Sequence, residues 1–143
     1  MGTDISTTID IAATPERVWA VLTDFAGYRA WNPVFCEASG ELALGNQLTL
    51  TTIQPRNDRT MTVKVKVVAV KPAAELGWQS RMYGLASSKR SFLLSPDGSG
   101  TQLTQIGVYQ GLFTSFPPKV IGRIQNNFDA INEAVKEQAE AAS

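Results

Sequence analysis

The sequence predicts an α+β domain in which an antiparallel sheet packs against one long C-terminal helix. Two changes in hydrophobic spacing indicate this fold class. Apolar residues alternate with a period of two near the N-terminus and again from Pro33 to residue 111, whereas segments 14–31 and 117–140 follow a helical period. Short turn signals between successive strands favour antiparallel pairing. The expected order is one strand, two short helices, six strands and a long helix.

The N-terminal third begins with a strand and continues into the two short helices. In "STTIDIAA" the isoleucines alternate as in a strand, and Thr14 then offers a favourable N-cap with Pro15 at the first helical position. A second helical turn is expected at Tyr28–Trp31. Pro33 disfavours helical geometry at Asn32, so we expect the chain to leave the helix there and the Asn32 side chain to bond the freed backbone groups.

The later strands and the last helix have the clearest patterns. "MTVKVKVVAV" alternates valines with lysines, and "PDGSG" is typical of a hairpin turn. Lys64 and Lys66 are expected to form a solvated strand face, with contact to an anionic surface as the alternative. The last segment begins at Pro117 and Pro118 and would make a helix of about 24 residues, roughly 36 Å long. Its apolar stripe consists of Ile121, Ile124, Phe128, Ile131 and Val135.

Composition excludes several classes of function. The chain has 143 residues, which fits one domain over residues 1–143. Thirteen basic and 13 acidic residues give a net charge of zero, so no basic surplus favours nucleic acid. There is no histidine for a nucleophilic pair or a metal site, and the lone Cys36 cannot form an internal disulfide. We expect no metal, no cofactor, no stable membrane insertion and a cytoplasmic location.

Three quoted stretches, together with the strand run, carry a resemblance to a known superfamily: "IDIAATPERVWAVLTDFAGYRAWNP", "SFLLSPDGSGTQLTQ" and "NNFDAINEAVKEQAE". They resemble the START-like, or SRPBCC, superfamily and within it the polyketide cyclase/dehydrase-like branch. The resemblance covers nearly the whole chain and includes no catalytic signature. It implies a helix-grip fold, in which a seven-stranded antiparallel sheet wraps around the long C-terminal helix, two short helices lie between the first two strands, and a cavity for a hydrophobic ligand lies between sheet and helix.

In such a fold, the inward phase of each strand and the apolar stripe of the helix predict which side chains line the cavity. Core packing is the competing interpretation for the aromatic residues among them. We expect Trp31 to be mostly buried where the short helices meet the sheet, closing one end of the cavity. The predicted ligand-binding residues are Trp31, Leu50, Val65, Trp78, Met82, Arg90, Phe92, Gln105, Tyr109, Phe113, Ile121, Ile124 and Phe128.

Three polar side chains in this set have two interpretations each. Arg90 shares the phase of inward-facing Phe92, so it either holds a ligand carboxylate, phenolate or carbonyl, or reaches solvent near the strand end. Gln105 and Tyr109 either orient a ligand or satisfy one another and water.

Candidates for acid or base catalysis are few, and we assign no catalytic residue. Only Glu37 has an ambiguous strand phase among the carboxylates. Many members of the superfamily carry an acidic residue where this chain has Gly107, which weakens any acid/base role taken from the resemblance. Gly107 would instead make room in the cavity.

The leading functional prediction is binding or transport of a small hydrophobic ligand, either lipid-like or aromatic and polyketide-like. One alternative is a polyketide cyclase or aromatase in which Tyr109, Arg90 and Glu37 assist proton movement. Another is a protein-interaction module with a vestigial cavity. The sequence does not predict the ligand's identity or the oligomeric state.

Overall fold

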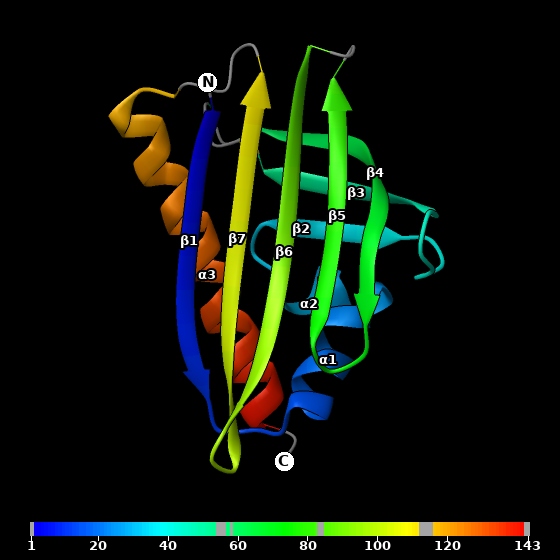
Figure 1. Ribbon diagram of the computed structural model, residues 1–143, viewed down its shortest axis with the longest axis vertical. Coiled ribbons are helices and arrows are strands. Elements are labelled where there is room, and N and C mark those ends of the chain that lie inside the picture. Colours follow the sequence, from blue (N-terminus) through cyan, green and yellow to red (C-terminus); the bar gives the residue numbers. More distant parts are fainter. Residues whose placement is uncertain (1, 54–56, 58, 83–84, 112–115, 142–143) are drawn as a thin grey trace.

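The computed structural model describes residues 2–53, 57, 59–82, 85–111 and 116–141. Seven strands form one antiparallel sheet in the order β1-β7-β6-β5-β4-β3-β2, and the long helix α3 lies behind it in Figure 1. The predicted α+β architecture is confirmed. The elements are β1 (Gly2–Ile11), α1 (Pro15–Thr23), the 3₁₀ helix η1 (Phe25–Gly27), α2 (Tyr28–Trp31), β2 (Phe35–Ser39), β3 (Gln47–Ile53), β4 (Thr60–Lys71), β5 (Glu75–Met82), β6 (Ala86–Asp97), β7 (Gly100–Gly111) and α3 (Pro118–Ala141).

Local side-chain bonds fix the ends of the short helices as the sequence predicts. The Thr14 hydroxyl accepts a hydrogen bond of 3.2 Å from the Arg17 backbone N–H at the start of α1. After α2, the Asn32 side-chain oxygen accepts from the backbone N–H groups of Val34 at 3.0 Å and Phe35 at 2.8 Å. These two bonds satisfy the groups that leave the helix and aim the chain into β2.

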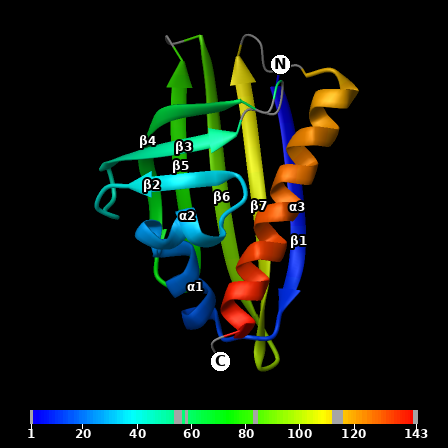
Figure 2. The same cartoon turned by 180° about the vertical axis from the view of Figure 1, so that it is seen from behind.

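The sheet curls because β4 pairs with different neighbours along its two halves. Its first half, Thr60–Lys66, pairs with β3, whereas Lys66–Lys71 pairs with β5 through a bulge between Val67 and Ala69. In Figure 2, β2, β3 and the start of β4 therefore run across the other strands. On the concave side, α3 lies along β1 and β7, and α1 and α2 cover the lower end. No helix in these described residues is long and apolar enough to cross a membrane.

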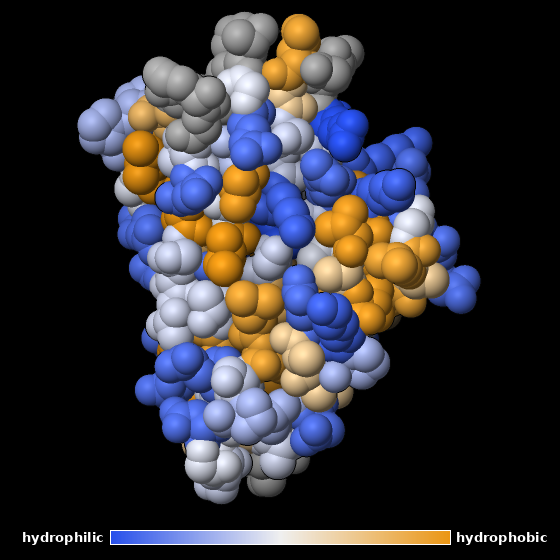
Figure 3. Space-filling model, in the orientation of Figure 1, coloured by the Kyte–Doolittle hydropathy of each residue, from blue (hydrophilic) through white to orange (hydrophobic). Residues whose placement is uncertain are grey.

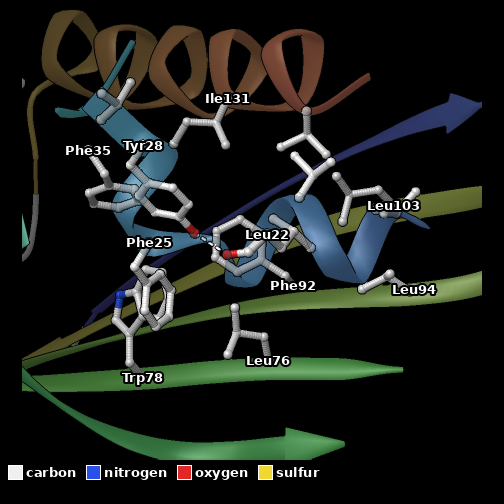
Figure 4. Packing of buried hydrophobic residues seen from close by; sticks show 14 of the residues in the cluster. Leu22, Phe25, Tyr28, Phe35, Leu76, Trp78, Phe92, Leu94, Leu103 and Ile131 are labelled. Atoms are coloured by element: carbon white, nitrogen blue, oxygen red, sulfur yellow. Dashed lines mark hydrogen bonds between the residues drawn. The ribbon is translucent and has the colours of Figure 1, made fainter. Parts of the chain in front are cut away.

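The lower part of the concave side is a fully packed core, which we call the packed half. Side chains from four strands meet there beneath α1, α2 and the C-terminal part of α3 (Figure 4). The Tyr28 hydroxyl donates to the Leu22 carbonyl oxygen within this core, and burial raises the pKa of that phenol. Its strand residues include Leu76, Phe92, Leu94 and Leu103, and none of these exposes more than 6% of its surface.

Candidate ligand-binding site

Inward-facing side chains at the other end of the same strands keep part of their surface accessible. On β6, Arg90 and Ser88 continue the inward phase of Phe92, and on β5 Ser80 continues that of Trp78. We call the accessible set the Arg90 face; it comprises Val63, Ser80, Ser88, Arg90, Tyr109 and Ile121. These residues point to the concave side and are only half-buried, so part of their surface stays accessible on that side of the sheet.

Arg90 lies at the centre of this face in an unusual environment for a cation. Its guanidinium carbon is 4.8 Å from the centroid of the Phe35 ring and 4.1 Å from that of Phe128. Arg90 Nη1 donates to Gln105 Oε1 at 3.0 Å, and the Tyr109 hydroxyl is a second hydrogen-bond partner. Burial lowers the pKa of the guanidinium, while the Tyr109 contact acts in the opposite direction. Arginine nevertheless stays protonated in proteins, so the cation is held largely by rings and neutral oxygens.

Gln105 connects Arg90 to the helix. Its Nε2 donates to the Phe128 backbone carbonyl at 2.9 Å and to Asn132 Oδ1 at 2.5 Å, and the whole side chain is buried. Asn132 is also buried, and its Nδ2 has no hydrogen-bond partner among the described residues. Both amide hydrogens and the oxygen of Gln105 are thus bonded to protein groups, one of which is Arg90.

Gly107 permits the close approach of Phe128 to the sheet. A Cβ at residue 107 would lie 2.6 Å from Phe128 Cζ and 3.1 Å from Tyr109 Cε2. From the sequence we expected this glycine to leave room in a cavity, and that expectation is wrong at this point. The Phe128 ring fills the room and, by doing so, reaches the Arg90 guanidinium.

An aromatic layer separates the two ends of the concave side. The Phe35 and Trp78 rings meet edge to face at 5.6 Å between centroids, and Trp78 and Phe92 at 5.4 Å. All three residues are buried. The layer lies between the Arg90 face and the packed half.

The predicted ligand-binding residues whose side chains the structure describes divide into two groups. Trp31, Arg90, Tyr109 and Ile121 keep accessible surface, although Trp31 belongs to α2, where it packs edge to face on Tyr28 at 5.2 Å. The buried members are Leu50, Val65, Trp78, Phe92, Gln105, Ile124 and Phe128. The Met82 side chain and Phe113 lie outside the described part of the chain.

Two residues of the site were missed, and one candidate lies elsewhere. Phe35 and Asn132 contact the Arg90 network, and Asn132 was detectable because it follows Phe128 by one helical turn. Phe35 lies just before a bulge that shifts the phase of β2. The same shift turns Glu37 outward, where it bonds Arg29 at 3.0 Å and is 58% exposed.

A separate pocket of about 510 Å³ opens on the outer face of the sheet, near the point where β4 leaves β5. Figure 3 shows this face, on which hydrophobic and hydrophilic patches alternate. Three cations line the pocket, namely Lys64, Lys66 and Arg81. Its other lining residues are Gly45, Gln47, Val65, Val68 and Gln79.

Comparisons with known proteins agree with this fold. A START superfamily protein from Mycobacterium smegmatis superposes with a TM-score of 0.80 at 19% identity, covering 99% of this chain and 100% of that one. A protein from Thermus thermophilus gives 0.80 at 15% identity, with 99% of both chains covered. The Zhui aromatase/cyclase from a Streptomyces species gives 0.76 at 18% identity, with 96% of this chain and 93% of that one covered.

At these identities the structural likeness shows the fold, while the sequence match shows the family. No curated protein matches the sequence significantly. Residues 2–140 match the family described as polyketide cyclase/dehydrase and lipid transport. The chain therefore belongs to that family and has its START-like, helix-grip fold.

Proposed function

We propose that this protein binds a small hydrophobic molecule at the Arg90 face, between the sheet and α3. One observation carries the proposal: inward-facing side chains remain accessible around Arg90, whereas those two to four residues further along the same strands are buried. A sheet that closed on its helix along its full length would bury both sets equally.

The chemistry of the surroundings supports a mainly apolar ligand. Ile121 and Val63 contribute aliphatic surface, and the Tyr109 and Phe116 rings meet edge to face at 5.5 Å. Burying apolar ligand surface is worth about 25 cal/mol per Å². The family description, which includes lipid transport, agrees with such a ligand.

A cyclase of the aromatase type is the second candidate, favoured by the contact between the Tyr109 hydroxyl and the Arg90 guanidinium. A phenol hydroxyl held beside a guanidinium is placed to exchange a proton with a bound substrate. The chemistry would depend on this pair, because Glu37 is turned away. Tyr109→Phe preserves the ring and removes the hydroxyl, so it should abolish turnover of a polyketide-like substrate while leaving binding intact.

The binding proposal is tested by titration with N-phenyl-1-naphthylamine, an uncharged apolar fluorophore. Ser88→Phe adds a ring to the accessible concave side, so it should weaken binding at least tenfold. Ser87→Phe is the matched control, because its side chain lies on the outer face of the same strand. The proposal is wrong if the wild-type protein does not bind the fluorophore, or if the Ser87 variant is weakened and the Ser88 variant is not.

A further inference from the structure

We propose that the ligand carries a carboxylate, which pairs with the Arg90 guanidinium, at the end of an apolar body. This inference rests on the proposed function and names the ligand class. A fatty acid or an aromatic carboxylic acid has the required chemistry, and the corresponding alcohol lacks it.

No carboxylate in the described part of the chain pairs with the charge of Arg90. Removing a guanidinium from water is costly unless an anion compensates it. None of the ion pairs formed among the described residues involves Arg90, and its side-chain partners are the neutral groups of Gln105 and Tyr109. The rings of Phe35 and Phe128 offset part of the cost through cation–π contact. An anion held next to Arg90 would supply the missing compensation.

Among the described groups around Arg90, hydrogen-bond donors outnumber acceptors. A guanidinium has five N–H donors, and each side-chain amide has two. The two amide hydrogens of Gln105 bond to Phe128 and Asn132, and its oxygen accepts one hydrogen bond of 3.0 Å from Arg90. The remaining N–H groups of Arg90 therefore gain no further acceptor from the Gln105 amide nitrogen. At the far end of the network, Asn132 Nδ2 has no described acceptor. A network with more donors than acceptors accommodates an acceptor-only group such as a carboxylate.

The shape and single charge of the guanidinium decide which anion fits. Arg90 alone is charged among the residues that define the Arg90 face. One planar guanidinium matches the single charge and the two coplanar oxygens of a carboxylate. A phosphate monoester carries a charge of about −1.5 to −2 near neutral pH and would need further cations. A carboxylate is therefore the better match.

The outer pocket is the competing place for an anion. Lys64, Lys66 and Arg81 line it, but all three side chains belong to exposed residues that water already solvates. Water therefore already compensates their charges. Arg81 thus provides a matched control, since it is an arginine on a neighbouring strand that points to the opposite face.

The test compares dodecanoate, dodecan-1-ol and dodecyl phosphate as competitors of N-phenyl-1-naphthylamine, using the wild-type protein, Arg90→Gln and Arg81→Gln. Charge-assisted hydrogen bonds to Arg90 should make dodecanoate bind on the order of tenfold or more tighter than dodecan-1-ol. Arg90→Gln should remove this preference. Arg81→Gln should keep it. The thermal midpoint of each variant verifies folding, and the comparison in the wild-type protein stands even if Arg90→Gln does not fold.

Each other outcome overturns the inference in a recognisable way. If dodecanoate and dodecan-1-ol bind equally, the carboxylate assignment fails and the proposed function stands. If dodecyl phosphate binds more tightly than dodecanoate, the headgroup assignment is wrong. If Arg81→Gln abolishes the preference, the anion binds the outer pocket. If neither the fluorophore nor any of the three dodecyl compounds binds, the proposed function itself fails.

Discussion

The packed half and the Arg90 face are built on the same strands and differ in what covers them. Phe92 and Arg90 are two residues apart on β6 and point to the same side, yet Phe92 is 1% exposed whereas Arg90 remains half-buried. The lower end is covered by α1, α2 and the C-terminal part of α3, and the upper end by the N-terminal part of α3. Strand phase thus decides which side a residue faces, and the helices decide whether it becomes core or site.

The largest expected effect is the loss of stability when an aromatic side chain is truncated, and it should differ between the packed half and the Arg90 face. Phe92→Ala should lower the free energy of unfolding by about 3–5 kcal/mol, because it opens a cavity in the packed half. Tyr109→Ala should cost at most about 2 kcal/mol, since its ring is already partly solvated. Urea denaturation measures both. Equal losses at the two sites would show that the Arg90 face is as tightly packed as the rest of the core.

A substitution at Gly107 tests how tightly α3 packs on the sheet between the packed half and the Arg90 face. Gly107→Ala should destabilise the protein by about 1–3 kcal/mol, because the new Cβ would meet Phe128 Cζ at 2.6 Å. The control is Gly122→Ala in α3, where an added Cβ has no neighbour within 4 Å. That change should stabilise the helix by roughly 0.5–1 kcal/mol. If Gly107→Ala left the free energy of unfolding unchanged, the close contact between Phe128 and β7 would not contribute to stability.

Removing one hydroxyl group from each region repeats the comparison with a smaller expected change in the free energy of unfolding. Thr101→Val should cost about 1–2 kcal/mol, because the buried hydroxyl donates to the Ala13 carbonyl oxygen at 2.7 Å. Ser88→Ala at the Arg90 face should change the free energy of unfolding by no more than about 0.5 kcal/mol. Thermal denaturation distinguishes the two. A large loss at Ser88 would reveal a structural role that its accessible position does not predict.

The smallest effect is pH-dependent and concerns the end of α3 beside the packed half. Glu140 accepts hydrogen bonds from Lys136 at 2.7 Å and from the Ala12 backbone N–H at 2.8 Å, which lowers the pKa of its carboxyl. Its stabilising contribution is complete above the ordinary glutamate pKa of about 4.3 and is lost as the pH falls through the lowered value. Glu140→Gln should therefore lower the thermal midpoint slightly at neutral pH. A difference that persists unchanged in acid would contradict this assignment.

Sequence patterns predicted the fold well because its elements obey local rules. The Thr14 cap, the Asn32 turn and the phase of β6 are each set within a few residues. The site was harder to predict, since Arg90 meets Gln105 and Phe128 from two other elements. Bulges also shift strand phase without a sequence signal, and that shift settled the direction of Glu37.

The spacing of apolar residues does not indicate which parts of the sheet the helices cover. Strand phase alone defines one inward-facing set, and within it the buried Leu50 and Phe92 could not be distinguished from the accessible Arg90 and Tyr109. The distinction depends on how far α1 and α2 extend over the sheet, which is a property of tertiary packing. The ligand roles of these residues remain predictions.

The most direct test of the account is a crystal structure of the protein with dodecanoate. We expect the carboxylate within hydrogen-bonding distance of the Arg90 guanidinium, with the alkyl chain between the upper strands and α3, and no change in the packed half. A ligand bound in the outer pocket beside Lys64, Lys66 and Arg81, or one inserted among Leu76, Phe92 and Leu103, would contradict it.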